Sequence, residues 1–170
     1  MAKKNKNKFN EAALSIPSTY LKVITGVSAL ILSLLLLIAA YGKLFYPSEG
    51  LYILDYIASV CELVLLANLI LYCNRWKMWL IASSVFATWG GYSFFWYQVE
   101  LPCFCMGASL DLPSGLSLII NGLFYALSMT MVYLLKASRQ WFCGGICSAC
   151  LLAIGGFFFA QWVYHQFVLN

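Results

Sequence analysis

The sequence predicts an all-α membrane protein, a polytopic bundle of transmembrane helices, and three observations support this fold class. Of its 170 residues, 63% are hydrophobic and only 9% are charged, whereas soluble domains average about 25% charged residues. The hydrophobic residues fall into five runs, and each is near the roughly 20 residues that a helix needs to cross a bilayer. The four prolines lie at or near the ends of these runs, which favours unbroken helices.

The runs give five expected spans. The first contains LILSLLLLIAA and follows a lysine-rich tail. It is longer than the core of a typical signal peptide and lacks a clear cleavage site, so we expect it to remain as a helix. The five spans are expected at residues 20–41, 51–73, 78–97, 113–135 and 141–164.

The basic residues predict how these spans are oriented. If the five spans alternate in direction, nine of the ten Lys and Arg residues fall on one side, and only Lys43 falls on the other. Basic loops stay in the cytoplasm, so we expect the N-terminus inside a bacterial inner membrane. The loop after the third span and the C-terminus are then extracytoplasmic. The net charge of +4 reflects this topology, and we expect no nucleic-acid partner.

The most polar internal segment, ELPCFCMGASLDLP at residues 100–113, carries a C-x-C pair, Cys103 and Cys105. The predicted orientation places this loop outside, where disulfides persist. A C-x-C disulfide closes a very small ring, which strains the bond and makes it easy to reduce, and it removes little loop entropy. The pair is therefore better suited to thiol–disulfide exchange than to stabilising a fold. A structural bridge or two unpaired thiols are the alternatives.

A copper site is a second interpretation of the same loop. Cys103, Cys105 and Met106 are soft ligands close together, of the kind that Cu(I) prefers. His165, near the outer end of the fifth span, offers a nitrogen. One short motif supplies few ligands, so we favour the redox interpretation.

The other cysteines lie within or beside the spans. Cys61 is in the middle of the second span, and Cys73 is at its inner end. Cys143, Cys147 and Cys150 open the fifth span at spacings of four and three, which places them on one helix face. We expect them to act as small residues that pack against a neighbouring helix, together with nearby glycines.

Two carboxyl groups lie in the second span. Glu62 is near its middle, and a carboxyl at that depth is a candidate functional group because its burial is costly. Asp55 lies two turns outward on the same face. The two residues would form a polar stripe that carries protons or contacts a partner. The structural alternative is a hydrogen bond from Glu62 to Asn68, Asn121 or a hydroxyl group.

The segment TWGGYSFFWYQ, residues 88–98, crowds aromatic residues just before the C-x-C loop. Trp and Tyr gather at membrane interfaces in general, and this explains most of the segment. A quinone headgroup stacked on Trp89, Tyr92 or Trp96 is the functional alternative, and a quinone is the one cofactor that the sequence suggests.

Three motifs in this order resemble the DoxX/MauE group of small redox-associated membrane proteins. The first span ends in AAYGKLFYP, the second carries CELVLL, and PCFCMG precedes the fourth. These motifs are similar to that group's small-residue, Lys and Pro turn, to its intramembrane Glu, and to its C-x-C-F-G loop. The matching residues are Ala39, Ala40, Lys43, Pro47, Glu62, Cys103, Cys105 and Gly107, with Met106 in place of the usual Phe.

The resemblance implies a four-helix membrane domain over residues 20–135, preceded by a basic cytoplasmic tail at 1–19. Residues 136–170, with the fifth span and a short outer tail, depart from the four-helix pattern. The resemblance also implies extracytoplasmic thiol–disulfide or electron-transfer chemistry beside a thioredoxin-like or other redox partner.

Together these observations predict a membrane thiol–disulfide oxidoreductase, or an accessory subunit of one, in which Cys103 and Cys105 are catalytic. No second cysteine pair lies outside, so the pair serves a bound acceptor or a partner protein. Lys43, placed in the first outer loop, or His165 is the nearest expected cation for a thiolate. A non-enzymatic anchor or assembly subunit of a larger complex is the alternative from a different class.

Overall fold

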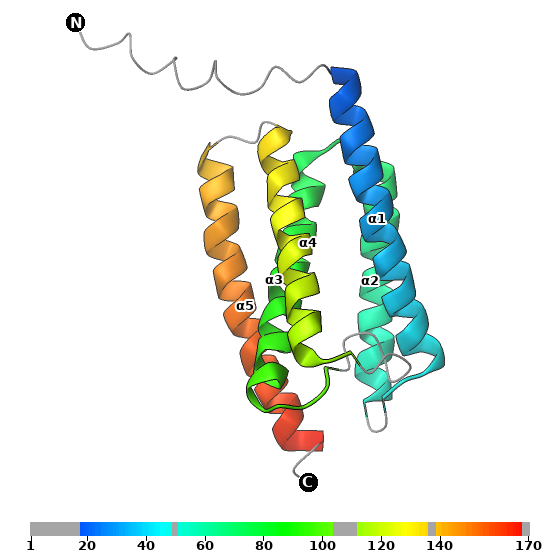
Figure 1. Cartoon of the computed structure of the whole chain (residues 1–170), viewed down its shortest axis with the longest axis vertical. Coiled ribbons are helices and arrows are strands. Elements are labelled where there is room, and N and C mark those ends of the chain that lie inside the picture. The colour runs from blue at the N-terminus through cyan, green and yellow to red at the C-terminus, as the bar shows by residue number, and fades with distance from the viewer. Residues whose placement is uncertain (1–17, 49–50, 104–111, 136–138, 168–170) are drawn as a thin grey trace, which may run out of the picture.

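The part of the chain that the structure describes folds into five α-helices that run roughly along one axis (Figure 1). The computed structural model describes residues 18–48, 51–103, 112–135 and 139–167. Within these ranges there is no regular β-strand, and the fold class predicted from the sequence is confirmed. The helices are α1 (Ser18–Phe45), α2 (Tyr52–Tyr72), α3 (Trp76–Gln98), α4 (Ser114–Leu134) and α5 (Arg139–Phe167).

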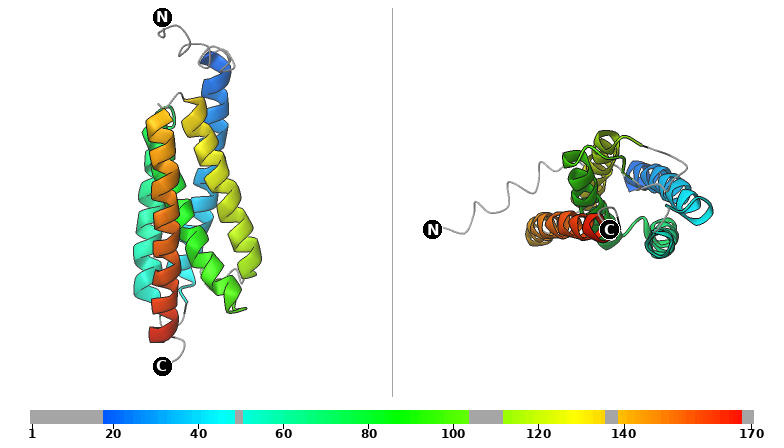
Figure 2. Two further views of the ribbon diagram at one scale, coloured as in Figure 1. Left: turned by 90° about the vertical axis from the view of Figure 1, so that its left-hand side faces the viewer. Right: turned by 90° about the horizontal axis from the view of Figure 1, so that it is seen from below.

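Four of these helices, α1, α2, α4 and α5, are long and apolar enough to cross a membrane. The remaining helix, α3, has 23 residues, and its buried residues combine small and polar side chains with four large aromatic ones. It lies between α4 and α5, with α1 and α2 beside them (Figure 2). A helix enclosed by other helices contacts little lipid, which is the physical reason that its composition differs from that of its neighbours.

The helices form two groups. α1 packs mainly against α2, while α3 packs mainly against α4 and α5. A core cluster joins the groups through completely buried side chains that include Leu36, Leu69, Trp79 and Phe86. The five-helix bundle is therefore a hairpin of α1 and α2 placed against a three-helix unit.

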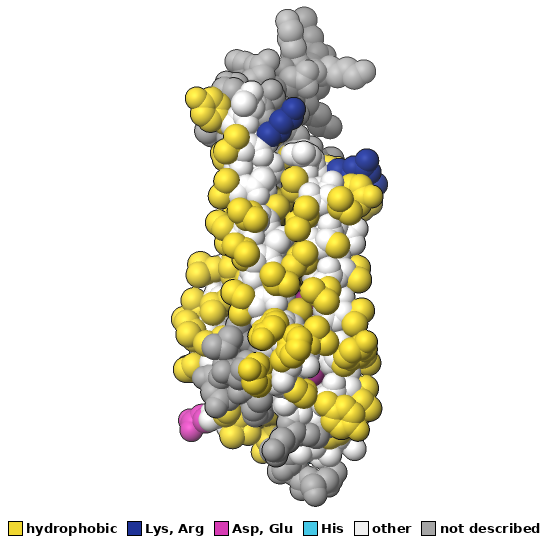
Figure 3. All heavy atoms as spheres, turned by 90° about the vertical axis from the view of Figure 1, so that its right-hand side faces the viewer, with side chains coloured by type: hydrophobic (Ala, Val, Ile, Leu, Met, Phe, Trp, Pro, Cys, Tyr) yellow, Lys and Arg dark blue, Asp and Glu magenta, His cyan; other side chains and the backbone are white. Residues whose placement is uncertain are grey.

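The outer surface is consistent with a lipid environment. On the face that Figure 3 shows, hydrophobic side chains cover the length of the bundle, and Lys and Arg side chains gather toward the end at which α1 begins. Lys22, Arg75 and Lys77 are exposed. Lys22 lies near the start of α1, and Arg75 and Lys77 lie at the start of α3. These features support a multi-pass membrane protein.

α5 is held close to α3 by two glycines. A Cβ atom added at Gly91 would lie 1.8 Å from the backbone oxygen of Ala153, and one added at Gly156 would lie 2.0 Å from the backbone oxygen of Thr88. Any larger residue at either position would force the two backbones apart. Glycines at this crossing therefore permit a contact of the small-residue type found in membrane helices.

The cysteines of α5 do not share this role. Cys143, Cys147 and Cys150 are exposed on the outer side of the helix, so the expectation that they pack against a neighbouring helix is wrong. Gly145, with Leu80 against it, and the buried Ala149 form the inward face instead. The helical spacing correctly placed the three sulfurs on one face, but it did not determine which way that face points.

Candidate functional site

The C-terminus of α3 directs the chain toward Cys103. The amide of Leu101 donates to the carbonyl of Trp96 at 3.2 Å, and the amide of Glu100 donates to that of Tyr97 at 3.3 Å. This pair of bonds forms a Schellman motif, in which the residue after the C-cap adopts a left-handed backbone conformation. That residue is Glu100, with φ of 56°, in a position that usually holds glycine. The helix therefore ends abruptly, and Pro102 follows.

Cys103 is fixed between α3 and α4. Its amide donates to the carbonyl of Leu112 at 3.4 Å, and the two residues form an isolated antiparallel bridge. Leu112 is followed by Pro113, the N-cap of α4, so the bridge holds Cys103 against the first turns of that helix.

The Cys103 side chain is only 1% exposed and is surrounded by hydroxyl groups. Ser117 Oγ donates to Cys103 Sγ at 3.6 Å, and Ser93 Oγ lies 3.6 Å from the same sulfur. The two hydroxyls also share a hydrogen bond of 3.0 Å. The two hydroxyls come from different helices, because Ser93 is in α3 and Ser117 is in α4.

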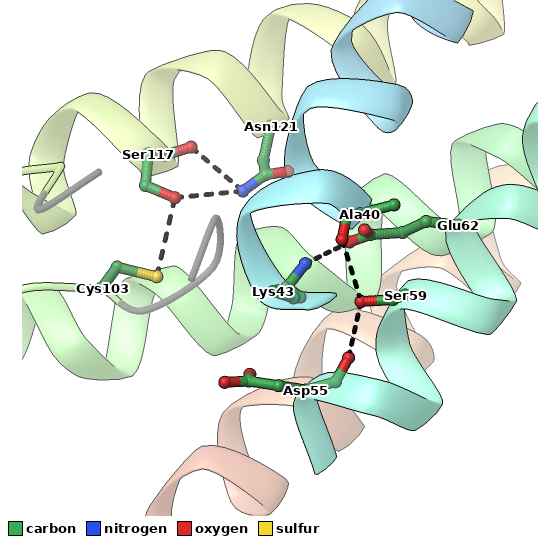
Figure 4. A network of polar contacts seen from close by, with 8 residues as sticks. All are labelled: Ala40, Lys43, Asp55, Ser59, Glu62, Cys103, Ser117 and Asn121. Atoms are coloured by element: carbon green, nitrogen blue, oxygen red, sulfur yellow. Dashed lines mark hydrogen bonds and ion pairs between the residues drawn. The ribbon is translucent and has the colours of Figure 1, made fainter. Parts of the chain in front are cut away.

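Asn121 contacts both serines, and Figure 4 shows its side chain beside Ser117. Its Nδ2 donates to Ser93 Oγ at 3.1 Å and to the carbonyl of Ser117 at 3.0 Å. Each hydroxyl has one proton, so the bonds form a chain in which Asn121 donates to Ser93, Ser93 donates to Ser117, and Ser117 donates to the sulfur. Donors around a sulfur stabilise its thiolate form. We refer to Ser93, Ser117 and Asn121 as the hydroxyl–amide cluster.

Cys103 is disulfide-bonded. Cys61, Cys73, Cys143, Cys147 and Cys150 are free thiols. Cys105 and Met106 lie outside the described residues. The predicted chemistry of the C-x-C loop therefore stays a prediction at these two positions.

The predicted intramembrane glutamate is paired with a lysine. Lys43 Nζ donates to Glu62 Oε1, and the two side chains are almost completely buried. Lys43 lies within α1 and not in the first outer loop, so the predicted position of Lys43 is wrong. The reason is that α1 continues to Phe45, about one turn beyond the end of the apolar run. A helix can continue past its apolar run when the next polar side chain has a buried partner.

The hydrogen-bond partners considered for Glu62 are also wrong. Asn68 donates to the carbonyl of Val64 in its own helix, and Asn121 belongs to the hydroxyl–amide cluster. The second carboxylate oxygen, Glu62 Oε2, is buried and accepts no hydrogen bond from the described residues. The pair therefore joins α1 to α2 with one acceptor oxygen unused.

Asp55 and Glu62 lie on the same buried face of α2, as the sequence predicted. Asp55 Oδ2 accepts a hydrogen bond of 2.7 Å from the amide of Ser48, which fixes the turn between α1 and α2. Between the two carboxylates, Ser59 Oγ donates to the carbonyl of Asp55 at 2.8 Å and lies 3.3 Å from that of Ala40. Figure 4 shows this second polar network on α1 and α2, together with Cys103 and the two α4 members of the hydroxyl–amide cluster, Ser117 and Asn121.

The aromatic residues of α3 divide between inside and outside. Trp96 is completely buried in a core cluster that also contains Cys103, whereas Phe94 and Tyr97 are exposed. The interface-belt interpretation therefore describes only the outward residues. Tyr92 contacts Trp96, with ring centroids 6.0 Å apart, and Lys43 Nζ lies 4.5 Å from the centre of the Trp89 ring. Trp89 thus links the ion pair to α3 through a cation–π contact.

A cavity of about 170 Å³ lies between the two helix groups. Lys43 of α1, Asp55 of α2, and Trp89 and Tyr92 of α3 line it, and Gly156, Phe159 and Val163 of α5 form the remaining wall. The structure thus brings four of the predicted residues to one cavity. Trp96 lies outside its lining and packs with Cys103.

His165 is exposed near the end of α5, where its ring contacts Tyr164. No described group of three His, Cys, Asp or Glu side chains is placed to hold a metal ion. The copper hypothesis depends on Cys105 and Met106, so it remains untested.

The contact between the hydroxyl–amide cluster and Cys103 was not predicted from the sequence. One signal was available, because Ser117 and Asn121 are four residues apart and therefore share one face of a helix. Nothing in the sequence indicated that this face meets Ser93 and Cys103.

Comparisons with known proteins identify no relative of this chain. No family model matches the chain, and no similar curated protein or solved structure was found.

Proposed function

We propose that this protein is a membrane thiol–disulfide oxidoreductase, or the redox subunit of one, whose reactive pair is Cys103 and Cys105. The observation that carries the proposal is the environment of Cys103, a disulfide-bonded sulfur held within hydrogen-bonding reach of two buried hydroxyls. Five of the seven cysteines are free thiols. Cys105 is the remaining cysteine, and the proposal assigns it as the partner of Cys103.

Burial assigns different roles to the two sulfurs. Cys103 is almost inaccessible, so an incoming thiolate of a partner protein attacks the sulfur of Cys105. The bond between Cys105 and Cys103 breaks, a mixed disulfide with the partner forms, and Cys103 leaves as a thiolate. A leaving thiolate is released faster when it is stabilised, and Ser117 supplies a stabilising donor that is held in place by Ser93 and Asn121.

The second step completes the exchange. A second thiolate of the partner attacks the partner's own sulfur in the mixed disulfide and releases Cys105 as a thiolate. The partner thereby gains a disulfide, and the pair Cys103 and Cys105 gains two electrons. A thioredoxin-like protein, with two neighbouring thiols, is the class of partner that this chemistry fits.

The proposal places the Cys103 end of the bundle outside the cytoplasm of a bacterial inner membrane. This end contains the C-termini of α1, α3 and α5. The exposed basic residues Lys22, Arg75 and Lys77 lie toward the opposite end, which supports a cytoplasmic location for that end. The resemblance of the sequence to the DoxX/MauE group supports the same chemistry and the same side of the membrane.

Thiol trapping in membranes tests this function. We expect Cys103 and Cys105 to resist alkylation until a reductant is added, and the oxidised protein to form one disulfide in a reduced thioredoxin-like protein. Replacement of either residue by serine abolishes the exchange, whereas Cys147→Ser, on the outer face of α5, leaves it unchanged. Free alkylation of both residues in an oxidising medium would refute the proposal.

The variant in which both cysteines are replaced by serine separates the two alternatives. If this variant loses only the assembly of a larger complex, the anchor function is correct. If the wild-type protein binds copper and this variant does not, the metal site is supported.

A further inference from the structure

The cavity beside Lys43 and Trp89 has the dimensions of a site for a single ring. Its volume is about 170 Å³, and apolar protein cavities of about 150 Å³ accommodate benzene. A six-membered ring with small substituents fits this space, whereas a three-ring flavin or a nicotinamide dinucleotide does not. Phe159 lines the cavity and is also exposed on the apolar outer surface. Phe159 is therefore the side chain that separates the cavity from the apolar outer surface, on the side from which a molecule in the bilayer would enter.

The lining supplies both a flat contact and a hydrogen-bond donor. Trp89 and Tyr92 provide aromatic surface. Lys43 Nζ has three protons and gives one to Glu62 Oε1, so among the described residues two protons have no hydrogen-bond acceptor and can be donated to a ligand. A carbonyl oxygen on the ring would accept such a bond, and the ammonium group would stabilise the negative charge that develops on that oxygen during reduction.

The cavity also shares its walls with the reactive sulfur. Leu51 and Val163 line the cavity and belong to the same buried cluster as Cys103 and Trp96. Tyr92 lines the cavity and packs against that cluster. An acceptor in the cavity is thus separated from Cys103 only by packed side chains.

We infer that this cavity binds the headgroup of a membrane-soluble quinone, which reoxidises the pair. This inference rests on the proposed function, since that function leaves Cys103 and Cys105 as a dithiol after each exchange. Two S–H bonds are lost and one S–S bond forms. The two electrons and two protons convert the two carbonyl groups of the quinone to the hydroxyl groups of a hydroquinone. The quinone is the oxidant, and no other reactant is needed.

α5 is an essential part of this site. Gly156, Phe159 and Val163 form one side of the cavity, and the contact of Gly156 with the backbone of Thr88 holds that side in place. The fifth helix lies outside the four-helix pattern that the sequence resembles. Its role here is to close a cavity that four helices would leave open.

Two matched substitutions on α2 test the inference. Ala58 lines the cavity, so Ala58→Phe fills it, while Val60 is exposed on the outer face of the same helix and Val60→Phe is the control. The protein is placed in nanodiscs of quinone-free phosphatidylcholine. It is then reduced, the reductant is removed, and ubiquinone-1 is added in the absence of oxygen. Quinone absorbance and free thiols are then measured. We expect one quinone reduced for each pair oxidised, a rate at least tenfold lower in Ala58→Phe, and an unchanged rate in Val60→Phe.

Two further readouts separate this inference from the proposed function. Binding of ubiquinone-1, followed by quenching of tryptophan fluorescence, should persist in Cys103→Ser and be lost in Ala58→Phe. Exchange with a reduced thioredoxin-like protein should persist in Ala58→Phe. If the wild-type protein performs the exchange but leaves ubiquinone-1 oxidised, or if both phenylalanine variants reduce it at the wild-type rate, the quinone site is wrong and the exchange function stands. Loss of both activities in the wild-type protein overturns both proposals.

Discussion

Lys43 and Glu62 form a buried ion pair that joins α1 to α2 in the interior of the bundle. Each of the two groups alone would be costly at this position, because an unpaired charge in a membrane protein interior has neither water nor a counterion. The pair is also the contact through which Trp89 of α3 meets the α1–α2 hairpin. It therefore contributes to the packing of the two helix groups as well as to the lining of the cavity.

The ion pair predicts a stability pattern in which the single variants are worse than the double variant. Lys43→Met leaves a buried carboxylate, and Glu62→Gln leaves a buried ammonium group; loss of one partner of a buried pair costs about 3–5 kcal/mol. Combining the two substitutions removes both charges and should restore much of the stability. Thermal unfolding midpoints in detergent measure the effect. Additive losses in the double variant would show that the two residues do not interact.

The crossing of α3 and α5 predicts opposite outcomes for adjacent glycines. Gly156→Ala places a methyl group against backbone atoms of Thr88 that cannot rotate away, and such overpacking costs about 1–3 kcal/mol. Gly155→Ala meets nothing within 4 Å, so alanine should be neutral or stabilise the helix by up to about 1 kcal/mol. The unfolding midpoints of the two variants should therefore move apart. Equal midpoints would contradict the close contact.

The hydroxyl–amide cluster predicts a slower release of the Cys103 thiolate when a donor is lost. Ser117→Ala removes a hydrogen bond to the sulfur, which is worth about 1 kcal/mol or about a fivefold change in rate. Stopped-flow exchange with a reduced dithiol protein measures this rate. Ser128→Ala is the matched control, because Ser128 is a buried serine of the same helix whose hydroxyl has no partner among the described residues. Similar rates for both variants would remove the cluster from the mechanism.

The left-handed residue at the end of α3 predicts that glycine is better than glutamate there. A non-glycine residue in this conformation costs about 1–2 kcal/mol, and glycine loses about 0.5–1 kcal/mol through its greater freedom in the unfolded chain. Glu100→Gly should therefore stabilise the protein by about 0.5–1 kcal/mol. Glu100→Ala keeps the strained Cβ atom and should give no such gain. A gain with alanine equal to that with glycine would indicate that the carboxylate, and not the backbone, is responsible.

The sequence alone determined the number of helices, their order and most of their bounds. For α1, α2, α4 and α5, these follow from the roughly 20 apolar residues that a helix needs to cross a bilayer, and this property is local to each run. The same applies to the alignment of Asp55 with Glu62, because the period of a helix fixes which residues of one helix share a face. Cys103 was singled out for an equally local reason, its place in a short polar loop.

Only the tertiary structure decided which faces meet. Glu62 is paired with Lys43, nineteen residues earlier in the chain, and Cys103 is surrounded by Ser93 and Ser117 from two different helices. The exposure of Cys147 and the burial of Gly156 were decided in the same way. Helical periodicity gives the composition of each face but not the rotation of the helix about its axis. That rotation is set by how all five helices pack together, and it brings Lys43, Trp89 and Tyr92 around one cavity beside Cys103.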